Sequence, residues 1–193
     1  MENKVETKNQ ILTIPNILSL FRIVLIPFIV WAYFGLEKPY IALGLIILSA
    51  ITDIVDGFIA RKFNMVSDFG KILDPIADKL TQGTVIICLT LKYQLMRVLI
   101  TLFIVKEIIM GLMGAITLKK YGKVNSAKWY GKVNTVILYA VMMLLVLFPD
   151  INLGLANALI YTCMVVMILA LIFYICFYVK IWRINKKNET LGQ

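Results

Sequence analysis

Five aspartates close together in the chain could bind a divalent metal ion. Residues 53–78 contain five of the six aspartates, in a sequence that is 61% hydrophobic and has no histidine. Carboxylates within or beside apolar spans persist where they face a polar cavity and are paired or bound to metal. Oxygen ligands without histidine or cysteine favour Mg²⁺ or Mn²⁺, and substrate phosphates usually complete such sites. The stretch therefore indicates a functional site that could bind such a cation.

The spacing of these residues places carboxylates on two helical faces. Residues on one face of a helix recur three, four, seven or eight positions apart. The first face carries Asp53, Asp56, Gly57 and Ala60. The second face carries Gly70, Asp74 and Asp78. Two such helices could meet with two carboxylates each, which would repel one another unless cations lay between them, and the small residues would let a ligand approach the backbone.

The acidic stretch is also compatible with two different roles. Aspartates at helix ends could cap and solvate a surface loop. Aspartates within a membrane could also line the permeation path of a divalent-cation transporter. The clustering of the acids toward one side, and the lack of an inverted sequence repeat, argue against a transporter. A transporter has no reason to bind CMP or CDP in a manner that depends on Mn²⁺, so nucleotide binding separates it from an enzyme.

The complete motif resembles a family signature. Asp53-x-x-Asp56-Gly57-x-x-Ala60-Arg61, then eight residues, then Gly70-x-x-x-Asp74-x-x-x-Asp78 is similar to the signature of the CDP-alcohol phosphotransferase (CDP-alcohol phosphatidyltransferase) family. All eight fixed positions are matched, and the resemblance extends over nearly the whole chain. Members are integral-membrane enzymes of phospholipid synthesis. The resemblance implies transfer of the phosphatidyl group of CDP-diacylglycerol to an alcohol, with release of CMP.

The resemblance also implies a role for each motif residue. Two ions, Mg²⁺ or Mn²⁺, would be held by four aspartates: Asp53, Asp56, Asp74 and Asp78. Asp78 would also be the catalytic base that accepts the proton of the acceptor hydroxyl. The CDP-binding residues would be Asp56, Gly57, Ala60, Arg61 and Gly70. In this set Arg61 would bind the diphosphate through charge-assisted hydrogen bonds.

The acceptor alcohol is indicated less directly. IPNILSLFR, GKILDPIADK and GKVNT resemble the bacterial phosphatidylglycerophosphate synthases, which use glycerol 3-phosphate. Those enzymes usually carry Arg-Glu and a second arginine eight positions on, where this chain has Lys106-Glu107 and Gly114. Lysine lacks the bidentate geometry of arginine, so a cardiolipin synthase that uses phosphatidylglycerol is the alternative. Lys106 and Lys132 are candidate acceptor-binding residues in either case.

The elements that must position these residues are expected to be membrane helices. The chain has 193 residues and a mean hydropathy of +0.87, which predicts one membrane domain over residues 1–193 with polar tails at 1–10 and 184–193. We expect an all-α bundle of six transmembrane helices, preceded by a short amphipathic interfacial helix at 14–22. The first expected span ends near residue 36. The other five cover residues 40–60, 70–91, 98–118, 133–148 and 153–179. Adjacent residues on a helix do not face each other, so Lys106 and Glu107 are not expected to form a simple pair.

The distribution of basic residues predicts the orientation and the partners. With six spans, the termini and the loops that follow the second and fourth spans share one side and most of the lysines and arginines. The positive-inside rule then places both termini and the aspartates on the cytoplasmic side of the cell membrane, in a multi-pass protein. The net charge of +9 favours anionic lipid head groups over nucleic acid as partners. The family resemblance suggests a homodimer.

Overall fold

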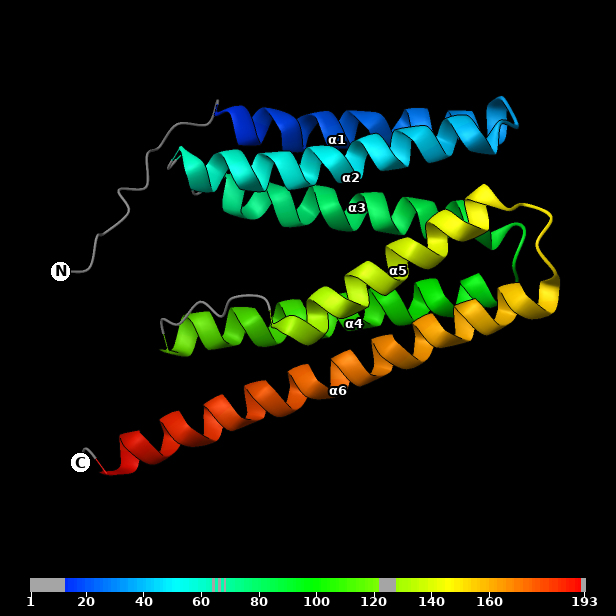
Figure 1. The fold of residues 1–193 in the computed structure, drawn as a ribbon. Helices are drawn as coiled ribbons and strands as arrows, with labels where there is room; N and C mark the ends of the chain where they lie inside the picture. The colour runs from blue at the N-terminus through cyan, green and yellow to red at the C-terminus, as the bar shows by residue number, and fades with distance from the viewer. Residues whose placement is uncertain (1–12, 64, 66, 68, 122–127, 192–193) are drawn as a thin grey trace. The chain divides into compact units, whose positions relative to one another are not determined.

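In the computed structural model all regular structure of the described residues is helical (Figure 1). The described residues are 13–63, 65, 67, 69–121 and 128–191, without the side chains of 61, 71, 121 and 186–191. The elements are α1 (Ile14–Val30), the π-helical turn η1 (Trp31–Gly35), α2 (Pro39–Lys62), α3 (Gly70–Thr90), α4 (Leu95–Tyr121), α5 (Trp129–Leu147) and α6 (Leu153–Leu191). The prediction of an all-α fold is confirmed.

Five of the described helical segments are long and apolar enough to cross a membrane. They are Ile14–Gly35, Pro39–Ala60, Leu95–Lys120, Trp129–Leu147 and Leu153–Asn185, so this is a helical membrane protein. The helix α3 has 21 residues, enough to span a bilayer, but it carries four charged residues within its first ten. Its role as the sixth span stays a prediction.

The helix α1 joins the predicted amphipathic segment to the first span. Residues 14–22, predicted as a short interfacial helix that leads into that span, form the first part of α1, which is continuous from Ile14 to Val30, and their position at a membrane interface stays a prediction. No helix breaker separates the two parts before Pro27, which lies inside the helix. The polar residues Asn16, Ser19 and Arg22 are buried, whereas Ile17 and other apolar side chains are exposed. The polar face of α1 therefore contacts protein instead of water.

The chain forms two compact units, and the first contains the aspartates. This unit comprises residues 1–91 and 142–150. Within it α1 packs against both α2 and α3, and the start of α1, the end of α2 and the start of α3 lie at the same end of the three helices (Figure 1). Its buried apolar side chains come from all three helices and include Leu25, Ile29, Ala42, Ile46, Ala77 and Ile86. This packing brings the two halves of the aspartate motif next to α1.

The second unit comprises residues 92–141 and 151–193. In it α4 packs against α6, and Trp182 Nε1 on α6 donates a hydrogen bond to Thr117 Oγ1 on α4 at 2.9 Å. The start of α5 contacts α6 through Tyr130, whose ring centroid lies 4.6 Å from that of Tyr174. Residues 1–10 of the predicted tails lie outside the described part, whereas residues 184–191 continue α6. The prediction of one domain over the whole chain stays a prediction.

Candidate active site

Three aspartates converge where the end of α2 meets the start of α3. Asp53 and Asp56 on α2 and Asp74 on α3 each offer one oxygen, and these oxygens lie within 4.8 Å of one another. The Asp56 side chain is buried, whereas those of Asp53 and Asp74 are 43% and 47% exposed. This all-oxygen donor set, with acids that are partly open to solvent, fits a hard divalent cation such as Mg²⁺ or Mn²⁺.

A buried arginine joins the three carboxylates. Arg22 on α1 donates hydrogen bonds to Asp53 Oδ1 and Asp74 Oδ1, and its Nη2 lies 2.8 Å from Asp56 Oδ2. Arg22 as a whole is only 1% exposed. The four side chains together carry two net negative charges, which one divalent cation would neutralise. Sequence reasoning missed Arg22, although an arginine within an apolar segment is itself a sign of function.

Asn16 and Ser67 connect α1 with the loop before α3. The Asn16 Nδ2 atom donates to Ser67 Oγ at 2.9 Å. Ser67 Oγ also accepts a hydrogen bond from the backbone nitrogen of Gly70 at 2.9 Å, so Ser67 satisfies an otherwise unpaired N–H group at the start of α3. A Cβ atom added at Gly70 would lie 2.3 Å from Asn16 Oδ1. Glycine at this position therefore permits the close approach of Asn16.

A pocket lies beside the three carboxylates. It has a volume of about 210 Å³. Its lining includes Asn16 and Asp74 together with four of the residues predicted to bind CDP: Asp56, Gly57, Ala60 and Gly70. The fifth, Arg61, has its side chain outside the described part. The lining combines small residues with the carboxylates of Asp56 and Asp74, a combination that can hold a ligand with phosphate groups next to a metal ion.

Asp78 is not one of the three aspartates whose oxygens lie within 4.8 Å of one another. It is on α3, one turn after Asp74, and the group found among the described residues does not include it. Gln82 Nε2 lies 2.9 Å from both Oδ1 and Oδ2 of Asp78, and Lys79 Nζ lies 3.5 Å from Oδ2. Because Gln82 is buried, it fixes the orientation of this carboxylate. The roles of Asp78 as a fourth metal ligand and as the base stay predictions.

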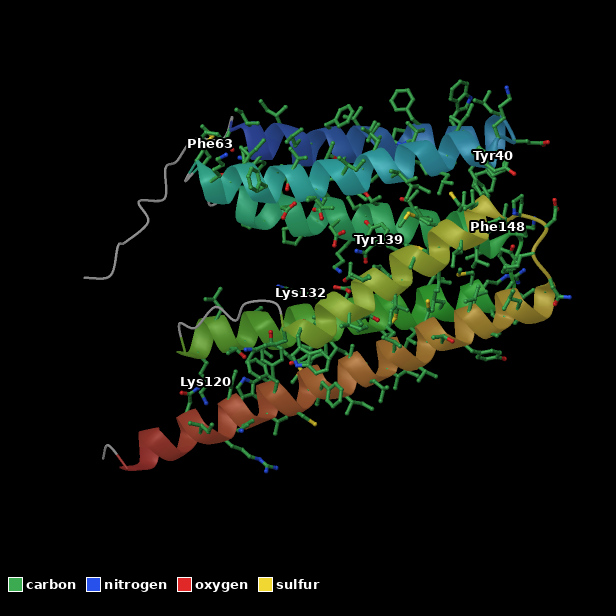
Figure 2. All side chains as sticks on the ribbon, viewed as in Figure 1. Tyr40, Phe63, Lys120, Lys132, Tyr139 and Phe148 are labelled. Atoms are coloured by element: carbon green, nitrogen blue, oxygen red, sulfur yellow. The ribbon has the colours of Figure 1, made fainter. Side chains whose placement is uncertain are left out.

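The two lysines predicted to bind the acceptor belong to the second unit. Lys106 on α4 is buried, and its Nζ lies 2.7 Å from Glu107 Oε1. The expectation that these neighbours do not pair is therefore wrong, because both long side chains can bend toward each other across the helix surface. Lys132 is exposed near the start of α5 (Figure 2). Acceptor binding by either lysine stays a prediction.

Comparison with known proteins identifies the class. Residues 12–184 match the family model described as CDP-alcohol phosphatidyltransferase. The match covers most of the 193 residues, and the chain belongs to this family.

Individual relatives share one name. The chain is similar to proteins named "CDP-diacylglycerol--glycerol-3-phosphate 3-phosphatidyltransferase" from three organisms. The identity is 49% over 81 residues for Rickettsia felis, covering 41% of this chain and 45% of that protein. It is 42% over 100 residues for Rickettsia bellii, covering 51% and 55%, and 39% over 82 residues for Escherichia coli K12, covering 42% and 45%. The chain thus spans about half the length of the curated relatives that it matches.

Proposed function

We propose that this chain is a phosphatidylglycerophosphate synthase. It transfers the phosphatidyl group of CDP-diacylglycerol to glycerol 3-phosphate and releases CMP. Family membership and the shared name of the relatives support this reaction class. The observation that carries the proposal is the pocket, because it gathers Asp56, Gly57, Ala60 and Gly70 beside Asp74. The pocket thus joins three motif residues of α2, which share one face of that helix, to two motif residues of α3.

The residues divide the reaction between them. Asp53, Asp56 and Asp74 would hold Mg²⁺ or Mn²⁺, and Asp78 would contribute to holding a second ion; the ions would supply positive charge against the phosphate groups. Gly57, Ala60 and Gly70 admit the CDP portion, and Arg61 binds its diphosphate. The remaining step is a substitution at the phosphorus atom.

The substitution needs a base for the acceptor hydroxyl. The acceptor oxygen forms a bond to the phosphatidyl phosphorus, and the bond from that phosphorus to the CMP oxygen breaks. The proton of the acceptor hydroxyl passes to Asp78. The two 2.9 Å contacts from Gln82 support this role, because they orient the carboxylate while Asp53, Asp56 and Asp74 remain available for metal.

The proposal includes a location and an assembly. The enzyme lies in the cell membrane with both termini and the aspartates on the cytoplasmic side, where nucleotides are found, and it works as a homodimer. The five apolar helical segments support the membrane location. The excess of lysine and arginine on one side supports the orientation.

The test is CMP release by the purified protein with CDP-diacylglycerol and Mg²⁺ or Mn²⁺. Glycerol 3-phosphate, phosphatidylglycerol, inositol phosphate and serine are compared as acceptors. Stimulation by glycerol 3-phosphate alone is the expected result. The Asp78→Asn variant should bind Mn²⁺ and CDP but lose at least about 100-fold in turnover, the usual range for a general base. The Asp53→Asn variant should bind Mn²⁺ more weakly.

A matched control is available in the sixth aspartate. Asp150 is exposed and lies outside the cluster, so Asp150→Asn should release CMP at the wild-type rate. Turnover of Asp78→Asn near that of Asp150→Asn would remove Asp78 from the base role. If no acceptor stimulates CMP release and the protein transports Mn²⁺ into vesicles, the enzyme hypothesis is wrong and the transporter hypothesis is supported.

One observation favours the second candidate, a cardiolipin synthase with phosphatidylglycerol as acceptor. Position 114 is glycine, and a Cβ atom there would lie 3.4 Å from the hydroxyl oxygen of Tyr178. This position therefore offers no cation for a second phosphate oxygen of the acceptor. Its glycine favours phosphatidylglycerol as the acceptor that needs fewer cationic contacts. Stimulation of CMP release by phosphatidylglycerol alone would establish this activity.

A further inference from the structure

Arg22 contacts the aspartate cluster in a way that resembles a bound cation. It is the buried centre to which three carboxylates from two other helices converge, and it engages one oxygen of each: Asp53 Oδ1, Asp56 Oδ2 and Asp74 Oδ1. Ser19 Oγ, one turn earlier on α1, lies 3.5 Å from the same Asp56 oxygen. Both terminal nitrogens of the guanidinium thus contact carboxylate oxygens, whereas its buried Nε has no hydrogen-bond partner among the described residues.

The charges of this group explain why a cation is needed there even without metal. Carboxylates a few ångströms apart in a partly buried site repel one another strongly. Asp56 is buried with only 4% of its side chain exposed, so water cannot screen it. Arg22 supplies the only positive charge that contacts the three carboxylates among the described residues. Without it, three negative charges would face one another.

A divalent ion bound to the same carboxylates would lie close to this guanidinium. Like charges in a medium of reduced dielectric constant repel each other. The Arg22 side chain is 2% exposed, so it cannot withdraw into solvent while α1 remains packed on α2 and α3. The arginine therefore stabilises the metal-free arrangement more than the metal-bound one.

We propose that Arg22 is a resident counter-cation that holds the three carboxylates together in the metal-free protein and thereby lowers the affinity of the site for divalent cations. The inference rests on the proposed metal site of the phosphatidyltransferase. It deepens that proposal, because it names the residue that sets how tightly the ion binds. Arg22 is a positioning residue and does not touch the reacting atoms.

The experiment measures Mn²⁺ binding and thermal stability of the purified full chain in detergent, without nucleotide. Mn²⁺ titrations followed by electron paramagnetic resonance give the dissociation constant. Arg22→Gln should bind Mn²⁺ about tenfold more tightly or better, because one unit charge a few ångströms away changes an affinity by at least that factor. Its Tm without metal should fall, and Mn²⁺ should raise its Tm more than that of the wild type.

Two further variants separate charge from folding. Arg22→Lys keeps a positive charge and should retain Mn²⁺ affinity within a few-fold of the wild type. The double variant Arg22→Gln with Asp74→Asn removes one charge of each sign, and its metal-free Tm should exceed that of Arg22→Gln alone. This comparison still applies if Arg22→Gln does not fold. Arg97→Gln, which changes an exposed arginine of the second unit, should match the wild type throughout.

Several results would overturn the inference. Equal or weaker Mn²⁺ binding by Arg22→Gln would mean that the arginine only orients the carboxylates. A double variant no more stable than Arg22→Gln would exclude charge compensation. CMP release by the wild type is measured separately. If the wild type releases CMP while Arg22→Gln shows no gain in Mn²⁺ affinity, the inference fails and the proposed function stands. If the wild type releases no CMP while Arg22→Gln binds Mn²⁺ more tightly, the inference stands and the proposed function fails.

Discussion

Gly70 shows how a single residue of the motif is fixed by a partner far away in the sequence. The atom nearest to a Cβ atom added at this position is Asn16 Oδ1, at 2.3 Å, and Ser67 Oγ follows at 3.0 Å. Asn16 and Ser67 are hydrogen-bonded across 51 positions of sequence. Glycine is therefore required here by the side chain of another helix, because α3 begins directly against it.

Replacement of Gly70 by alanine should disturb this contact. The methyl group should push Asn16 away from Ser67, at a cost of about 1–3 kcal/mol of stability by overpacking. It should also weaken the proposed binding of CDP, because Asn16 lines the pocket. Chemical unfolding and calorimetric CDP titration measure the two effects. Gly44→Ala is the matched control on α2, since nothing lies within 4 Å of its added Cβ atom. Wild-type affinity for CDP in Gly70→Ala would contradict the role of Asn16.

At this scale the sequence predicts some partners and cannot predict others. The aspartates are predictable from their spacing because Asp53 and Asp56, and likewise Gly70 and Asp74, are one turn apart on their helices. The contacts of Arg22 reach Asp53 and Asp74 across 31 and 52 positions, and no local period encodes such a distance. Gln82 follows Asp78 by one turn, so its contact with that carboxylate could have been predicted from spacing alone.

Among the helices, α5 and α6 depend on a glycine at their contact. A Cβ atom added at Gly131 would lie 2.2 Å from the hydroxyl oxygen of Tyr174 and 3.1 and 3.2 Å from two atoms of its ring. The backbone of α5 thus rests against a tyrosine of α6. A larger residue must displace the ring, which also contacts Tyr130.

Gly131→Ala should therefore destabilise the second unit by about 1–3 kcal/mol. Tyr174→Phe removes the clashing hydroxyl, and the double variant should recover part of the loss in a double-mutant cycle. Thermal unfolding in detergent gives the values. Gly111→Ala on α4, where nothing lies within 4 Å of the added Cβ atom, should unfold like the wild type. If the Gly131→Ala variant is as stable as the wild type, the side chain of Tyr174 can move aside without cost.

The helices were predictable where apolar length alone defines them. The expected spans 40–60, 98–118 and 133–148 coincide largely with α2, α4 and α5. For residues 14–22 the amphipathic pattern predicted a helix, which α1 confirms, but amphipathicity does not reveal what the polar face contacts. On α1 that face meets Asp53, Asp56 and Asp74 instead of water. The π-helical turn η1 has no signal in the hydrophobic pattern.

For the whole molecule the distribution of basic residues makes a direct prediction. A green fluorescent protein fused after Gln193 should fluoresce, because the positive-inside rule places the C-terminus in the cytoplasm. Alkaline phosphatase fused at the same point should be inactive. Active phosphatase would show that the orientation is the reverse of the predicted one. The aspartates would then lie on the side without nucleotides. The same fusions after Lys92, in the turn between α3 and α4, should give the opposite pair of signals if α3 spans the bilayer.

The ion pairs of Arg22 also affect how the protein is made. Arg22 leaves the ribosome 31 residues before Asp53 and 52 residues before Asp74, so α1 reaches the translocon with an arginine that has no partner yet. An arginine at the centre of a helix costs about 2.5–3.5 kcal/mol on insertion scales. Insertion of α1 should consequently wait for α2, and the two helices should enter the membrane together as a hairpin.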